Sequence, residues 1–561
     1  MTGRPHLLPT AVATSACAAI LALAACGGGT SAKTTAPPPA SATSSSAGTS
    51  AASAPSPADQ AALQRVVPAP TTTTAAAGAF TLTAATAIHA SPGAEPVASD
   101  LAAYLKQQTG LAPQTTADSG AAASTNAATA TSTAANTNTN TNTGIQLVLQ
   151  PTGGDPALGA EGYTLTTTPA SVTLTAATDA GLFHGVQTVR QLLIGDKLQA
   201  GTITDHPRFA YRGVMLDVAR HFFSVADVKA YIDAAALYKV NEFHLHLSDD
   251  QGWRLTVPGW PRLATVGGST QVGGGHGGSY TAADLKEIVD YAASRYMTVI
   301  PEIDMPGHVG AAVYAYPTLA CDGRHHGPVT SVSPGYDALC PSSESTYRFV
   351  DSAMKAAADA TAGSPYLHLG GDEAQALNLT QYNAFVQRAQ NVVAAHDRTP
   401  IAWAEAGTAP LLPQTILEYW NTAQPQPYVL QAAAKGTKLI MAPGDHAYLD
   451  QQPVAGFRLG LHWAGYVPVS KAYDWDPVTV LPGVAPSSVL GVEAPLWTET
   501  VKSLADAETL AFPRLPAIAE IGWSAPNTHD WPGFSHRLAD QAPLWDKLGI
   551  AYYKSPEIPW G

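Results

Sequence analysis

Basic side chains are scarce in this sequence, which has 29 lysines and arginines against 43 aspartates and glutamates, and a formal charge of −14. Such a balance disfavours nucleic-acid backbones and anionic membrane surfaces as partners. Tryptophan is missing from the first 252 residues, although the whole chain has 11. The two ends of the chain therefore differ in composition. With 561 residues, the chain is also too long for one ordinary core, so more than one domain is expected.

Long apolar runs are also rare. Residues 11–23 form one close to a basic start, after Arg4 and His6, and this pattern is typical of an export signal. The run ends in LAACG (23–27), which resembles the cleavage site of bacterial lipoproteins. On this interpretation residues 1–25 are removed, and Cys26 becomes a lipidated first residue that anchors the exported protein at the outer cell surface or envelope. A plain secretory signal with an incidental Cys26 is the alternative. No other segment is long and apolar enough to span a bilayer.

Cysteine occurs only four times. Cys17 lies in the expected signal and Cys26 at its cleavage site, which leaves Cys321 and Cys340. In an oxidising compartment these two are expected to form a disulfide. Two free thiols or a metal-binding pair are the alternatives, but no cluster of His and Cys with zinc spacing accompanies them.

The composition changes twice along the chain. Residues 26–65 consist largely of Ala, Ser, Thr, Gly and Pro, which cannot bury a core and predict a disordered tether. Residues 66–205 predict a small α+β domain in which 113–143, rich in Asn-Thr repeats, is a disordered surface insertion. Its expected strands lie at 80–82, 145–149, 163–165 and 172–174, and its expected helices at 97–109 and 181–193.

From residue 206 to 561 apolar strands alternate with helical stretches. Eight strands are expected, at 211–218, 242–248, 297–303, 366–370, 400–404, 415–420, 437–442 and 488–494. Helices are expected at 225–238, 282–296 and 343–360, among others. Eight such units predict an α/β fold, a closed (β/α)₈ TIM barrel. A doubly wound open sheet is the alternative, but the glycine run 273–278 does not sit between a strand and a helix as a phosphate-binding loop would. We expect that run to be a mobile loop.

Charged and aromatic residues, most of them acidic or tryptophan, follow most of these strands, where a barrel carries its active site. They include Asp217, Arg220, Asp249, Asp250, Glu302, Asp304, His308, Asp372, Glu373, Trp403, Glu405, Glu418, Trp420, Asp445, Tyr448, Asp450, Trp497 and Glu499. Carboxylates accept hydroxyl hydrogen bonds and indole rings stack on the C–H face of a sugar, so the mixture suits a carbohydrate. Capping and core packing are the ordinary alternatives for single members of this set.

His244 and His246 lie two residues apart, so they share one face of a strand. Such a pair occurs in metal-dependent hydrolases, but a complete ligand set would include further histidines at later strand ends. Filling of the barrel interior, or hydrogen bonding behind the site, is the favoured interpretation.

Seven stretches in this region together resemble glycoside hydrolase family 20, the β-N-acetylhexosaminidases. They are DVARHFF (217–223), HLHLSDDQGWR (244–254), PEIDMPGH (301–308), HLGGDE (368–373), AYLD (447–450), GLHWAGY (460–466) and GVEAPLWTE (491–499). They follow the family's order and span nearly all of 207–561. Residues 162–193 resemble the small domain that precedes the barrel in this family, whereas the Asn-Thr insertion is not part of the family pattern.

The resemblance implies an exo-acting hydrolase that removes terminal GlcNAc or GalNAc with retention of configuration. Glu373 is then the general acid, and Asp372 orients the substrate's 2-acetamido group and stabilises its developing positive charge. The acetamido oxygen is the nucleophile and forms an oxazolinium ion, which water opens. In this scheme we expect burial and neighbouring negative charge to raise the pKa of Glu373, while Asp372 is ionised.

The resemblance also implies the remaining roles, with no metal and no cofactor. Arg220 binds the 3- and 4-hydroxyls, Glu499 the 4- and 6-hydroxyls, and Asp450 the 6-hydroxyl, while Tyr448 donates to the acetamido oxygen. The residues expected to wall or shape the pocket are Trp403, Trp420, Trp463 and Trp497, and the supporting polar residues are Asp249, Asp304 and His308. Glu405 and Glu418 receive no role.

Three other functions stay open at this point. One is a non-catalytic, lipid-anchored sugar-binding protein, which would keep the tryptophan pocket without needing Glu373. Another is a related glycosidase that releases a disaccharide, and the third is a metal-dependent hydrolase. Oligomeric state and the preference between GlcNAc and GalNAc are not predicted.

Overall fold

The computed structural model describes residues 54–117, 143–333, 337–423 and 426–561. The expected signal 1–25 and Cys26 lie outside this part of the chain. Within it, no helix is long and apolar enough to cross a membrane.

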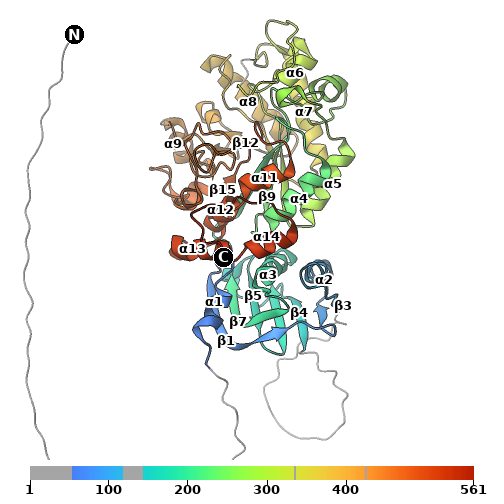
Figure 1. The fold of residues 1–561 in the computed structure, drawn as a ribbon. Coiled ribbons are helices and arrows are strands. Elements are labelled where there is room, and N and C mark those ends of the chain that lie inside the picture. Colours follow the sequence, from blue (N-terminus) through green and yellow to red (C-terminus); the bar gives the residue numbers. More distant parts are fainter. Residues whose placement is uncertain (1–53, 118–142, 334–336, 424–425) are drawn as a thin grey trace, which may run out of the picture. The chain divides into compact units, whose positions relative to one another are not determined.

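The first domain is built on a seven-stranded mixed sheet (Figure 1). The strand order is β1 (Thr72–Thr81), β7 (Lys197–Asp205), β5 (Tyr163–Thr167), β6 (Ser171–Ala176), β4 (Gly144–Leu149), β2 (Ala87–Ala90) and β3 (Gln114–Ala117). Its helices are α1 (Pro57–Leu63), α2 (Glu95–Thr109) and α3 (Asp179–Leu192). Helix α3 is buried over nearly its whole length against the sheet and the rest of the protein, so it joins this domain to the barrel core.

Two of the predicted boundaries in this domain are wrong. Helix α1 lies within 26–65, the expected tether, because Ser56 and Asp59 form a capping box and Leu63 is buried. Strand β3 lies within 113–143, the expected insertion, and pairs in parallel with β2. It is an edge strand whose four residues are all exposed, so its sequence carries no apolar alternation. The central stretch 118–142 lies outside the described residues.

The second domain is a closed barrel of eight parallel strands, which confirms the predicted fold. In chain order these strands are β8 (Tyr211–Asp217), β9 (Glu242–His246), β10 (Thr298–Glu302), β11 (Tyr366–His368), β12 (Thr399–Trp403), β13 (Ile416–Tyr419), β14 (Lys438–Met441) and β15 (Val489–Ala494). Strand β15 pairs with β8 and closes the ring, so the open-sheet alternative is wrong. The expected disulfide between Cys321 and Cys340 is confirmed.

Helices surround the barrel (Figure 1). Those that connect successive strands include α4 (Val225–Ala236), α5 (Ala282–Ala293), α7 (Glu344–Ala360), α8 (Leu379–Ala395) and α9 (Pro427–Ala434), and α12 (Arg514–Trp523) follows the last strand, β15. The other helices of this domain are α6 (Gly310–Ala315), α10 (Val469–Tyr473), α11 (Leu504–Ala511), α13 (Trp531–Ala539) and α14 (Ala542–Leu548). The glycine run 273–278 lies in a loop that begins with a single 3₁₀ turn, Val272–Gly274.

A buried ion pair joins the two domains. Lys239, which follows α4, donates to Asp205 at the end of β7 over 2.9 Å, and neither side chain is exposed. Asp205 also accepts hydrogen bonds from the Tyr163 hydroxyl at 2.8 Å and the Trp523 indole at 2.9 Å. These contacts connect the small sheet to the base of the barrel through polar side chains that are buried and paired with one another.

Asp205→Ala is expected to lower the free energy of unfolding by about 3–5 kcal/mol, because it leaves the Lys239 ammonium buried without its partner. Urea denaturation measures the loss. The control is Asp290→Ala, which removes the exposed pair with Lys286 and should cost less than about 0.5 kcal/mol. Equal effects of the two substitutions would contradict the role given to the buried pair.

Candidate active site

A cavity of about 390 Å³ opens among the loops that follow the barrel strands, a volume within the range of small-ligand pockets. Its lining consists of Arg220, Gln251, His308, Val332, Asp372, Glu373, Trp420, Asn421, Ala423, Tyr448, Leu461, Trp463, Trp497 and Glu499. The sequence predicted nine of these residues. Four other predicted residues, Asp249, Asp304, Trp403 and Asp450, are buried and do not line the cavity, but contact or neighbour residues that do.

The two adjacent carboxylates sit on a turn that only glycine permits. Strand β11 ends at His368, and Gly370 and Gly371 then adopt φ values of +71° and +110°. A Cβ atom on Gly370 would lie 1.8 Å from Asp304 Oδ1, and the Gly371 N–H donates to that same oxygen at 3.1 Å. The turn is therefore fixed on Asp304, and it brings Asp372 and Glu373 to the cavity wall.

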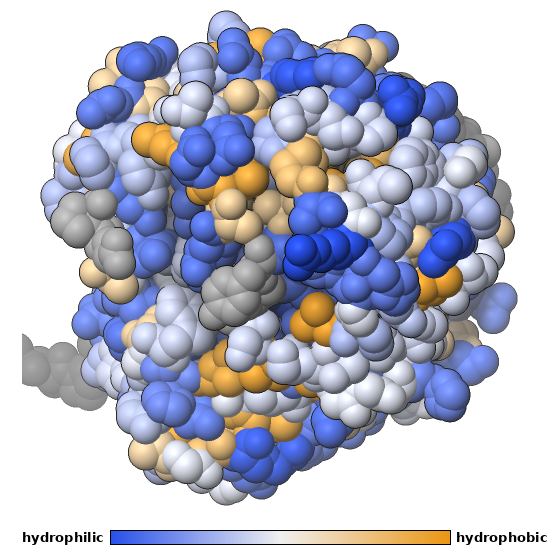
Figure 2. Space-filling model, turned by 90° about the horizontal axis from the view of Figure 1, so that it is seen from above, coloured by the Kyte–Doolittle hydropathy of each residue, from blue (hydrophilic) through white to orange (hydrophobic). Residues whose placement is uncertain are grey.

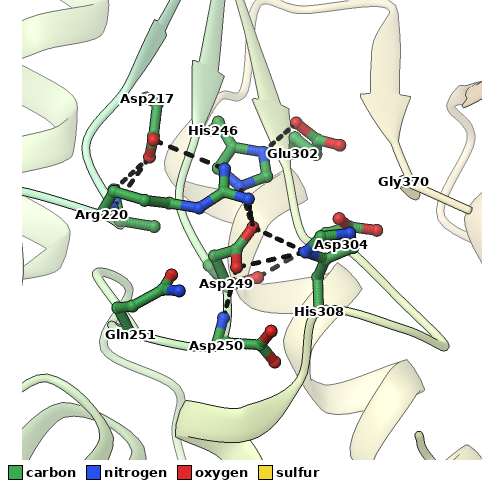
Figure 3. Close-up of polar contacts among 12 residues, drawn as sticks. Asp217, Arg220, His246, Asp249, Asp250, Gln251, Glu302, Asp304, His308 and Gly370 are labelled. Atoms are coloured by element: carbon green, nitrogen blue, oxygen red, sulfur yellow. Dashed lines mark hydrogen bonds and ion pairs between the residues drawn. The ribbon is translucent and has the colours of Figure 1, made fainter. Parts of the chain in front are cut away.

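His308 lies between these carboxylates and a third one, that of Asp249, which Figure 3 shows beside the His308 ring. Its Nε2 is 3.4 Å from Asp372 Oδ2 and 3.5 Å from Glu373 Oε2, and its Nδ1 is 3.2 Å from Asp249 Oδ2. Burial opposes a charge on the ring, but the carboxylates of Asp249 and Asp372 outweigh it and raise the pKa of His308 well above its ordinary value. The imidazole is thus a buried cation in contact with both members of the pair.

The surroundings shift the pKa values of the two adjacent acids in opposite directions. The His308 imidazole, whose Nε2 lies 3.5 Å from Glu373 Oε2, lowers the pKa of Glu373 and outweighs the opposite effect of burial. The pKa of Asp372 is raised, because burial and the charge of Glu373 outweigh His308. Burial and Asp372 also raise the pKa of Asp304 well above its ordinary value. The expectation for Glu373 was wrong because it considered neighbouring acids and left out the imidazolium.

Arg220 is held in place from two sides (Figure 3). Its Nη2 contacts Asp249 Oδ2 at 2.7 Å, and its Nη1 is 3.5 Å from Asp217 Oδ2 at the end of β8. The guanidinium carbon lies 4.8 Å from the centre of the Trp497 ring. Arg220 is therefore oriented as a donor at the cavity wall, with its planar fork fixed.

Aromatic side chains form another part of the wall. Trp420 stacks on Tyr448, with 6.4 Å between the ring centres and 17° between the ring planes. Trp463 meets both rings edge-on, with 5.7 Å between its ring centre and each of theirs. Trp463 is 50% exposed, so it lies at the mouth of the cavity. Trp403 lies deeper, where its indole N–H donates to Glu302 at 2.8 Å and its ring is 5.8 Å from that of Trp497.

Several buried oxygens near the cavity have no hydrogen-bond partner among the described residues. Asp372 Oδ1 and Asp450 Oδ1 are two of them. Burial and the neighbouring Glu499 raise the pKa of Asp450 to about 8. Because a buried acceptor without a donor is costly, these atoms mark places where a ligand N–H or O–H would be stabilising.

The histidine pair on β9 packs inside the barrel. His244 contacts Glu493 at 2.7 Å and Glu302 at 3.0 Å, and His246 contacts Asp249 at 3.1 Å and also bonds Glu302. Both nitrogens of each ring are therefore within reach of carboxylates. Through Asp249 this interior network connects to Arg220 and His308, which agrees with hydrogen bonding behind the site.

Sequence reasoning assigned no role to five lining residues, namely Gln251, Val332, Asn421, Ala423 and Leu461. Gln251 and Leu461 had a signal, since they belong to the stretches 244–254 and 460–466. The Gln251 amide donates to the Ser331 carbonyl at 2.9 Å. The other three lie in loops whose path depends on the fold, so their residue types alone gave no signal.

Comparisons with known proteins match both domains. The family model described as "Glycosyl hydrolase family 20, catalytic domain" matches residues 209–526, and "Glycosyl hydrolase family 20, domain 2" matches 63–206. A beta-N-acetylhexosaminidase from Cellulomonas fimi is 42% identical over 414 residues, which are 72% of this chain and 83% of the relative.

Solved structures agree with these matches. The GH20 beta-N-acetylhexosaminidase from Streptomyces coelicolor A3(2) has a TM-score of 0.82 and 44% identity, covering 89% of this chain and 99% of its own. A variant Streptomyces plicatus beta-hexosaminidase in complex with product GlcNAc has a TM-score of 0.83 and 44% identity, covering 89% and 98%. The chain therefore belongs to glycosyl hydrolase family 20, with the family's domain 2 followed by its catalytic barrel.

Proposed function

We propose that this protein is an exo-acting β-N-acetylhexosaminidase that hydrolyses terminal β-linked GlcNAc or GalNAc from chito-oligosaccharides or other glycans. The observation that carries the proposal is the adjacent pair Asp372 and Glu373 on the wall of a cavity that three tryptophans and Tyr448 also line. The named activities of the relatives from Cellulomonas fimi and Streptomyces plicatus support the substrate class.

In the proposed reaction the substrate supplies its own nucleophile. The oxygen of the 2-acetamido group bonds to the anomeric carbon while the glycosidic C–O bond breaks, and Glu373 gives its proton to the departing oxygen. Water then attacks the anomeric carbon, Glu373 takes the proton from that water, and the oxazolinium ring opens. Two displacements at one carbon retain its configuration. A nucleophile held within the substrate can reach effective molarities of about 10⁵–10⁸ M.

The protein's part is to orient that amide and to stabilise the cation. We assign Asp372 Oδ1 to the amide N–H, because it is a buried acceptor whose partner is not among the described residues. We assign the Tyr448 hydroxyl to the amide oxygen, with Trp420, Trp497 and, at the mouth, Trp463 enclosing the group. The Asp372 carboxylate is already directed at the acetamido group where positive charge develops. It can therefore stabilise that charge without the protein rearranging during the reaction.

The remaining groups are proposed to recognise the sugar's hydroxyls. Arg220 would donate to the 3- and 4-hydroxyls, and Glu499 would accept from the 4- and 6-hydroxyls. Asp450, whose Oδ1 lacks a partner among the described residues, would accept from the 6-hydroxyl. The protonated ring of His308 would place a positive charge beside Glu373. Asp249 and Asp304 would be the supporting polar residues around that ring.

A thiazoline analogue of the bicyclic intermediate is expected to inhibit competitively and to bind at least about 10²-fold more tightly than GlcNAc substrates. Inhibition of chromogenic GlcNAc glycoside hydrolysis measures this. The compound lacks a leaving group, so its affinity reports the binding of the sugar ring and its acetamido-derived ring without any contribution from the leaving group. Absence of inhibition at concentrations far above KM, in a preparation that hydrolyses the glycoside, would contradict substrate assistance.

We also propose that the protein is exported and lipid-anchored at the outer cell surface or envelope through Cys26. This proposal is supported by the sequence around the apolar run 11–23. Metabolic labelling with a fatty-acid probe should mark the wild-type protein in the membrane fraction, and Cys26→Ala should release an unlabelled protein. Unlabelled wild-type protein in the medium would instead support a plain secretory signal.

A further inference from the structure

Glu405 is an acid beside the cavity that the proposed reaction does not use. It lies in a 3₁₀ turn, Ala404–Thr408, directly after β12, and its side chain is partly buried. The turn is fixed by α8, because the Thr408 hydroxyl donates to Asn383 at 2.8 Å and the Asn383 amide donates back to the Thr408 carbonyl at 3.0 Å. Glu405 therefore projects from a rigid support.

Within the described part of the chain, the Glu405 carboxyl group accepts a side-chain hydrogen bond from an active-site tryptophan. The Trp420 indole N–H donates to Glu405 Oε2 at 3.0 Å. Trp420 is the ring that stacks on Tyr448, and only 8% of it is exposed. An indole has one donor and two faces, so a hydrogen bond at Nε1 together with stacking on one face fixes both its position and its tilt.

We propose that Glu405 is a positioning residue for the substrate-assisted reaction: its carboxyl holds the Trp420 ring against Tyr448 and so fixes the wall on which the reacting acetamido group lies. This inference rests on the proposed function. Glu405 contacts neither the glycosidic oxygen nor the anomeric carbon in that scheme, and it acts through Trp420.

The charge state of Glu405 is part of this arrangement. Burial and the nearby Asp372 raise the pKa of Glu405 to about 8. The other titratable groups that face it are Glu373, Tyr382 on α8 and Tyr428 on α9, and none of them supplies a cation. Glu405 is therefore a neutral acceptor through neutral pH, which adds no negative charge beside the catalytic pair.

Four variants test the proposal: Glu405→Gln, Glu405→Leu, Trp420→Phe and the Glu405→Leu/Trp420→Phe double variant. At pH 6, Glu405→Gln keeps a neutral acceptor of the same shape, so its kcat/KM on an aryl GlcNAc glycoside should stay within about twofold of wild type. Glu405→Leu should lower kcat/KM and thiazoline affinity by about tenfold, the scale of one lost hydrogen bond. Adding Glu405→Leu to Trp420→Phe should cost nothing further, because the donor is already gone.

The pH dependence of stability gives a second readout. The folded-state pKa of about 8 lies above the ordinary value near 4.3, so folded wild type keeps a proton that the unfolded chain releases. Its stability therefore falls as pH rises between these values. Glutamine does not titrate, so the Tm of Glu405→Gln minus that of wild type should increase from pH 5 to pH 8 and then level off.

Equal losses in Glu405→Gln and Glu405→Leu, or additive losses in the double variant, would overturn the proposal. A Tm difference that does not change with pH would overturn the charge state given to Glu405. If wild type hydrolyses no GlcNAc glycoside, the proposed function fails instead. In that case the Tm values of the same four variants still test the contact between Glu405 and Trp420.

Discussion

Glu373→Gln is expected to lower kcat/KM on chito-oligosaccharides by about 10²–10⁴-fold, the usual contribution of a general acid. The loss should be much smaller on aryl GlcNAc glycosides with good leaving groups, because those depart with little protonation. Glu373 lies on the cavity wall beside Asp372 and within 3.5 Å of the His308 ring. Its position allows a proton to be delivered to a bond inside the cavity.

Parallel assays of chitobiose and a dinitrophenyl GlcNAc glycoside measure the difference. Glu344→Gln is a suitable control, since Glu344 lies on the surface of α7 and pairs with Arg388. It should leave both activities at wild-type levels. Equal losses on the two substrates in Glu373→Gln would show that the residue does something other than donate the proton.

Asp372→Asn is expected to lower kcat by about 10²–10³-fold and to change KM far less, because the lost negative charge matters most when the acetamido group becomes cationic. The geometry is specific, since Asp372 Oδ1 is a buried acceptor without a partner among the described residues. Asparagine keeps the shape and an acceptor oxygen, so ground-state binding should largely survive.

Steady-state kinetics with an aryl GlcNAc glycoside separate these two effects. Thiazoline affinity should fall together with kcat, since the analogue resembles the intermediate. A variant in which KM rises while kcat is unchanged would assign Asp372 to substrate binding alone, and the proposed mechanism would then need another source of charge stabilisation.

The barrel was predictable because its strands are buried on both faces. Such strands appear as continuous apolar runs, and each of the eight expected runs overlaps a strand of the structure. Strands of the small domain that face solvent were harder to see. The edge strand β3, with its four exposed residues, and β2, with a half-buried alternation, carry too little apolar signal. Helix α1 was hidden by its alanine-rich surroundings, although the Ser56–Asp59 capping box was present in the sequence.

The residues of the site also divide into those that the sequence predicts and those that it does not. Residues directly after a strand were predictable, because the barrel dictates where strand ends lie. Loop residues outside the matching stretches, such as Val332, were not, since nothing local determines which part of a loop reaches the cavity. Proton affinities depend on distances between elements. The lowered pKa of Glu373 comes from His308, which is 65 positions away in the sequence but in contact in the fold.

The face in Figure 2 is a mosaic of hydrophilic and hydrophobic residues, with the hydrophobic ones in small scattered patches. Charged and aromatic side chains converge in the cavity, where the proposed chemistry takes place.

The central claim is that the substrate's own amide attacks the anomeric carbon. The most direct measurement is kcat/KM of the wild-type protein on paired aryl β-glycosides that differ only at position 2, one bearing an acetamido group and the other a hydroxyl. Because the hydroxyl compound lacks the internal nucleophile, we predict a preference for the acetamido compound on the order of 10⁵-fold or more. Comparable rates for the two compounds would contradict the account.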